Sequence, residues 1–129
     1  MPAHPYFQSQ PIWQPTLADA LREAAATQRR VFLTIGRIDC GGSRALVEKV
    51  IGKEEIFEYL VDKFVCVALD ADALDDQAQK LVARMKSGSK TPLCLYLDAA
   101  GTLVLDSAGG RPAAVFLNDL VEAATRRVV

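Results

Sequence analysis

The tetrapeptide Cys40-Gly41-Gly42-Ser43 is the segment whose residue types and spacing could perform chemistry. A cysteine is nucleophilic as its thiolate, and a thiol with an ordinary pKa near 8.5 is mostly protonated at neutral pH. Apolar residues at helical spacing follow the tetrapeptide, which predicts that Cys40 begins a helix. Backbone N–H groups and the helix dipole favour an anion there, and the Ser43 hydroxyl, one turn on, could donate to the sulfur. We therefore predict a lowered pKa and thiol chemistry for Cys40, with Ser43 as its partner.

Neighbouring charges act on this thiol in opposite directions. Arg37 and Arg44 would add positive potential, whereas Asp39 would oppose it. A second interpretation is that Ser43 serves only as a residue favoured at helix starts, and that Cys40 has no chemical role. The residues themselves leave both interpretations open.

The remaining reactive side chains are predicted to be structural. Cys66 and Cys94 lie within apolar runs, where a buried cysteine commonly behaves as a small hydrophobic residue. An alternative role for Cys94, two residues past Pro92, is that of a hidden second thiol. The single histidine, His4, lies in a proline-rich segment, and the three cysteines are too far apart for the close pairs of a zinc site. We expect no bound metal.

Composition limits the class of protein. The 129 residues fit one domain, and the net charge of −1 with scattered Lys and Arg argues against a nucleic-acid or anionic-membrane surface. No apolar run approaches the roughly 18 residues of a membrane-spanning helix. The first residues lack the features of a signal peptide, which favours a cytoplasmic protein, although a periplasmic or secreted protein whose leader has been removed would look the same. We expect a monomer.

The order of apolar segments predicts an α/β domain. Residues 1–15 hold four of the six prolines and are expected to form an irregular arm, while residues 16–129 form the domain. The expected elements are a helix over 17–28, a strand over 31–36, a helix over 40–52, a helical segment near 56–60, a strand over 64–69, a helix over 73–86, strands over 93–97 and 102–107, and a helix over 113–127. Continuously apolar strands indicate helices on both faces of a four-stranded mixed sheet.

The sequence resembles the thioredoxin superfamily over about residues 16–127. The resemblance rests on a buried strand ending at Gly36, a cysteine at the next helix start, Thr91-Pro92 before the third strand, the turn Asp98-Ala99-Ala100-Gly101 and Gly110 before the last helix. It implies a thioredoxin-like fold with an N-terminal helix and a cis-proline at Pro92 facing Cys40. It also implies that an extended client peptide could pair with the backbone at Thr91.

The chain departs from the family pattern where the chemistry takes place. The family motif has two cysteines separated by two residues, and Ser43 stands in place of the second one. Asp39 replaces the usual tryptophan, Gly42 the usual proline, and Thr34 a buried acid that serves the second thiol. The resemblance thus implies a monothiol CxxS protein that needs no cofactor and forms a mixed disulfide with a client protein or with glutathione as co-substrate. The implied substrate-binding residues are Gly41, Gly42, Thr91 and Pro92. The alternative is a redox-inactive adaptor that binds a peptide or protein partner.

Overall fold

The fold is built on a five-stranded mixed sheet. The computed structural model describes residues 13–37 and 41–127. The strands follow the order β1-β3-β2-β4-β5 across the sheet, and their bounds are β1 Trp13–Gln14, β2 Arg30–Gly36, β3 Phe64–Asp70, β4 Leu93–Leu97 and β5 Leu103–Ala108.

Strand direction follows from the length of the connections. β2 and β3 pair in parallel from Arg30 opposite Phe64 to Gly36 opposite Asp70, because the helices between them return the chain to the same end of the sheet. β4 runs antiparallel to β2, and the short turn after β4 makes β5 its antiparallel neighbour. β4 is buried along its whole length, and β2 at every residue after Arg30.

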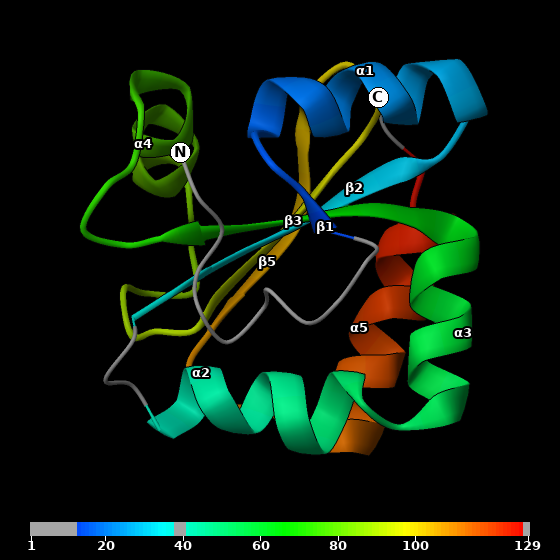
Figure 1. Ribbon diagram of the computed structural model, residues 1–129, viewed down its shortest axis with the longest axis vertical. Coiled ribbons are helices and arrows are strands. Elements are labelled where there is room, and N and C mark those ends of the chain that lie inside the picture. Colours follow the sequence, from blue (N-terminus) through cyan, green and yellow to red (C-terminus); the bar gives the residue numbers. More distant parts are fainter. Residues whose placement is uncertain (1–12, 38–40, 128–129) are drawn as a thin grey trace.

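Helices cover both faces of the sheet (Figure 1). They are α1 Leu17–Thr27, α2 Gly41–Ala45, the π-helix η2 Leu46–Ile51 that continues α2, α3 Glu54–Lys63, α4 Asp76–Ala83 and α5 Ala113–Thr125. α1 and α4 pack on one face, where they meet Val31, Leu33 and Ile35 of β2. η2, α3 and α5 pack on the other face.

The second face is held together by aromatic side chains. Phe32 lies with its ring centroid 5.4 Å from Tyr96 and 5.6 Å from Phe116, and Phe64 lies 5.9 Å from Tyr96. All four are fully or almost fully buried. This cluster fixes α5 against the middle of the sheet, on the same face as the helix that follows position 40.

The expected α/β class, the order of the elements from residue 17 onwards and the mixed sheet are confirmed. The number of strands is wrong: Trp13 and Gln14, inside the segment expected to be irregular, pair with Cys66 and Val67 and add a fifth strand. Residues 1–12 lie outside the described residues. Thr16 caps α1, since its hydroxyl accepts from the Asp19 N–H at 3.0 Å.

Two helices differ in detail from the prediction. α4 starts at Asp76, three residues later than expected, because Asp75 caps it by accepting from the Ala78 N–H at 2.8 Å. The helix over 40–52 changes from α to π at Leu46. Its buried residues Leu46, Val50 and Ile51 are spaced by four and five positions, a pattern that fits either kind of helix.

Candidate thiol site

The described part of the candidate site is the first turn of α2. Cys40 lies outside the described residues, as does Asp39, so the predicted position of the thiol stays a prediction. α2 begins at Gly41, directly after it. Solvent exposure falls along this turn: Gly41 is exposed, Gly42 is half-buried and Ser43 is fully buried. Position 40 is therefore followed by a helical turn whose third residue faces the sheet.

Ser43 lies directly on the end of β2. A Cβ placed on Gly36 would lie 2.6 Å from Ser43 Oγ and 3.0 Å from Ser43 Cβ, closer than two such atoms can approach. Only glycine at position 36 lets the helix come this near. The sequence predicts Gly36 as the end of the strand, but its role in placing Ser43 becomes visible only in the fold.

The Ser43 hydroxyl is held in a defined position. Its Oγ accepts a hydrogen bond from the Arg37 backbone N–H at 3.3 Å. A hydroxyl carries one donor and two acceptor positions, so this bond leaves the proton available for another acceptor.

The charge of Arg37 is shared with a carboxylate. Its guanidinium forms an ion pair with Asp72, in the loop after β3, and both side chains are well exposed. An exposed pair of this kind contributes little to stability, but it reduces the positive potential that Arg37 can supply nearby. Arg37 therefore acts on this site less as a cation than through its backbone N–H.

The Thr91-Pro92 segment lies at the same end of the sheet as Ser43. The Thr91–Pro92 peptide bond is cis, and Pro92 is buried. β2 and β4 pair with Ile35 opposite Leu93, and extending this antiparallel register by one residue sets Gly36 opposite Pro92. Since Ser43 packs on Gly36, the turn after position 40 and the proline are brought together.

Thr34 links the two strands beneath this end of the sheet. It is fully buried, and its hydroxyl donates to the Leu93 carbonyl at 3.0 Å, with Cys94 Sγ 4.0 Å away. Thr34 thus fixes the strand that begins just after Pro92. It carries no ionisable group that could take a proton from a second thiol.

The two described cysteines are unsuited to nucleophilic chemistry. Burial raises the pKa of the Cys94 thiol to about 12, although the Thr34 and Ser107 hydroxyls lower it in part. Burial also raises the pKa of Cys66 far above that of an ordinary thiol, with Arg29 opposing the shift. Both residues are core side chains, and both stay protonated at neutral pH.

The described ranges contain neither a candidate metal site nor a candidate membrane-spanning helix. Across residues 13–37 and 41–127, no three His, Cys, Asp or Glu side chains are grouped so as to hold a metal ion. In the same part of the chain, no helix has the length and apolar character needed to cross a bilayer.

Comparison with known proteins assigns the family. Residues 12–99 match the sequence model of a family described as thioredoxin-like. The match covers more than half of the chain, from the first strand to the turn after β4. The protein therefore belongs to the thioredoxin-like family. A search among functionally curated proteins finds no match.

Solved structures agree on the fold. A thioredoxin from Thermus thermophilus superposes with a TM-score of 0.73 at 23% identity, covering 88% of this chain and 87% of that one. A putative disulphide-isomerase from Bacteroides thetaiotaomicron gives 0.71 at 16% identity, with coverages of 90% and 94%. A disulphide isomerase from Xylella fastidiosa Temecula1 gives 0.65 at 17% identity, with coverages of 82% and 86%. At these identities the likeness establishes the thioredoxin-like fold.

Adding one methyl group at Gly36 should test the packing of Ser43. We expect Gly36→Ala to lower the free energy of unfolding by about 1–3 kcal/mol, because the new Cβ overlaps Ser43. Urea unfolding measures this change. Gly110→Ala is the matched control, since nothing lies within 4 Å of a Cβ there. Equal stability of the two variants would contradict the close approach.

The buried cysteines, Cys66 and Cys94, should not react with thiol reagents in the folded protein. In a Cys40→Ser variant at pH 8, we expect no reaction with a thiol reagent until urea unfolds the chain, when both remaining thiols react. The reason is that burial both shields the sulfurs and keeps their pKa values well above pH 8. Reaction in the folded state as fast as in urea would contradict the burial of Cys66 and Cys94.

Proposed function

We propose that the protein is a thioredoxin-like monothiol that forms mixed disulfides through Cys40. The observation that carries the proposal is the placement of Ser43, one turn after position 40, where its side chain is buried against Gly36 and its oxygen accepts from the Arg37 N–H. A thiolate at a helix start gains from the backbone N–H groups and from a nearby hydroxyl donor. Both effects lower the pKa of Cys40, so a larger fraction of it is reactive at neutral pH.

The proposed step is thiol–disulfide exchange. The Cys40 thiolate attacks one sulfur of a disulfide, a new S–S bond forms to that sulfur, and the other sulfur leaves as a thiolate that takes up a proton. The product is a mixed disulfide between Cys40 and the client protein or glutathione. No electrons are lost in this exchange, because the disulfide bond moves from one pair of sulfurs to another.

Release of the mixed disulfide needs a thiol from outside the domain. Ser43 stands where an internal second thiol would attack, and an oxygen cannot take part in disulfide exchange. Cys94 is excluded from this role by its burial and raised pKa. Glutathione as co-substrate, or a second thiol of the client, completes the cycle.

The client is proposed to bind across the two segments that meet at this end of the sheet. The exposed Gly41 and the half-buried Gly42 form one side of the proposed site, and Thr91 with the cis-bonded Pro92 forms the other. Small side chains on the first segment allow a peptide to approach the helix start closely. This arrangement suits an extended peptide that carries a disulfide.

Incubating the reduced protein with glutathione disulfide, or with a disulfide-bonded peptide, should yield one adduct. We expect mass spectrometry under non-reducing conditions to locate it on Cys40, and we expect it to persist until an external thiol is added. Cys40→Ser is the control and should give no adduct. The proposal is contradicted if Cys40 stays unmodified while the same disulfide reacts with a small thiol, and the protein would then fit the redox-inactive adaptor.

A further inference from the structure

The loop that leads to Pro92 is fastened to the edge strand β5 at both ends. The loop covers residues 86–92, between the end of α4 and the start of β4. β5 is the last strand of the sheet and pairs with β4 alone. Its outer edge therefore has backbone and side-chain groups available to hold other parts of the chain.

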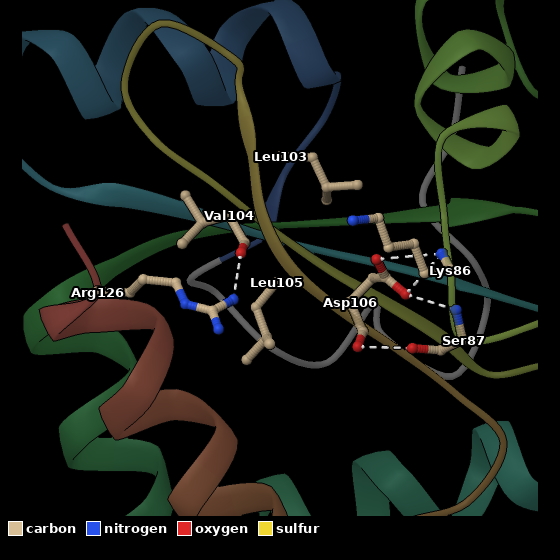
Figure 2. Close-up of a pocket in the computed structure, with 7 residues that line it drawn as sticks. All are labelled: Lys86, Ser87, Leu103, Val104, Leu105, Asp106 and Arg126. Atoms are coloured by element: carbon tan, nitrogen blue, oxygen red, sulfur yellow. Dashed lines mark hydrogen bonds between the residues drawn. The ribbon is translucent and has the colours of Figure 1, made fainter. Parts of the chain in front are cut away.

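Asp106 holds the first end of the loop. Its Oδ1 accepts from the backbone N–H groups of Lys86 at 3.2 Å and of Ser87 at 2.9 Å. Its backbone carbonyl accepts from the Ser87 hydroxyl at 3.0 Å. Figure 2 shows these bonds converging on Asp106 from the loop. A carboxylate that accepts from two successive backbone N–H groups forms charge-assisted bonds, which are stronger than neutral ones.

Gly109 holds the second end of the loop. Its N–H donates to the Lys90 carbonyl at 2.7 Å and to the Pro92 carbonyl at 3.1 Å. Between the two ends, a Cβ placed on Gly88 would lie 3.9 Å from Ala108 Cβ. The loop thus passes around the C-terminal end of β5, from the outer edge at Asp106 to the inner edge, where β4 begins.

From these contacts we propose that Asp106 is a positioning residue for the Thr91-Pro92 segment. It acts by fixing the first end of the loop to β5. Without the carboxylate, the backbone N–H groups of Lys86 and Ser87 lose their acceptor. The first end of the loop is then held to Asp106 only by the bond from the Ser87 hydroxyl to the backbone carbonyl. This inference rests on the proposed function, because it assigns Asp106 a part in client binding by the same site.

The surroundings of Asp106 make it suitable for substitution. It lies on the outer edge of β5 beside a cavity of about 230 Å³, which Lys86, Leu103 and Arg126 help to line (Figure 2). Its side chain is half-buried and is not part of either hydrophobic cluster. Loss of the carboxylate should therefore loosen the loop without unfolding the domain.

The test compares two rates for Cys40 in the full chain. In Asp106→Ala, we expect exchange with a disulfide-bonded peptide to slow by about tenfold, as for loss of one hydrogen bond to a charged group. We expect alkylation of Cys40 by iodoacetamide to keep its rate, since that small reagent does not need the loop. Amide hydrogen exchange should speed up at residues 86–91. Asp106→Asn, which keeps one acceptor oxygen, should recover part of the peptide rate.

Arg126→Ala is the matched control. Arg126 lines the same cavity and donates to the Val104 carbonyl at 3.0 Å on the same strand edge, but it makes no bond to the loop. It should leave the peptide rate unchanged. Equal peptide rates for wild type and Asp106→Ala would overturn the positioning role. Absence of exchange in the wild type would instead overturn the proposed function, so the two failures are distinguishable.

Discussion

The close approach of Ser43 to Gly36 is the contact on which the rest of the site depends. It joins the first turn of α2 to the end of β2, because Gly36 has no side chain to keep the Ser43 side chain away from the strand. β2 is the central strand and pairs with both β3 and β4, so whatever is fixed to its end is fixed to the whole sheet. The first turn of α2 is thus fixed to the sheet through Ser43.

The same strand end explains why the helix start and the cis-proline are neighbours. β4 begins directly after Pro92, and its register with β2 brings Pro92 opposite the glycine on which Ser43 packs. Thr34 strengthens this arrangement through its bond to the Leu93 carbonyl. The loop before Pro92 is then held by β5, so three strands contribute to one small region of the surface.

Beneath this end of the sheet, Thr34 supplies a hydroxyl group and no acid. The family resemblance places a buried acid at position 34, where it would serve a second cysteine, and this chain has a hydroxyl group there. Ser43 and Thr34 are both fully buried and both bond to the backbone. The two replacements are consistent with each other, because without a second thiol there is no proton for an acid–base group to transfer.

The helices and strands that a local pattern of apolar residues defines were predictable from the sequence. Apolar runs predicted β2, β3 and β4, and apolar residues at helical spacing predicted the helices. The strand at Trp13–Gln14 was not predictable in this way, because two residues carry no periodicity and their strand character comes from pairing with β3.

The contacts that build the site are mostly non-local and could not be read from spacing. Gly36 was predicted only as a strand end, since its packing on Ser43 depends on how the helix crosses the sheet. The hydrogen bonds of Asp106 could not be predicted from the sequence, because its partners lie 19 and 20 positions away in the chain. The motif at 40–43 and the Thr91-Pro92 pair were found from residue types, whereas what holds them in place required the fold.

The pH dependence of Cys40 alkylation tests the central claim most directly. The intact protein serves for this measurement, since the other two thiols are buried, and the same chain unfolded in urea gives the reference value. If Cys40 is a reactive thiol at the start of α2, the pH midpoint of its alkylation should lie clearly below the midpoint in the unfolded chain. The midpoint in the unfolded chain should be that of an ordinary thiol, about 8.5. A midpoint at or above the unfolded value would contradict a stabilised thiolate at position 40, and with it the account of a monothiol protein.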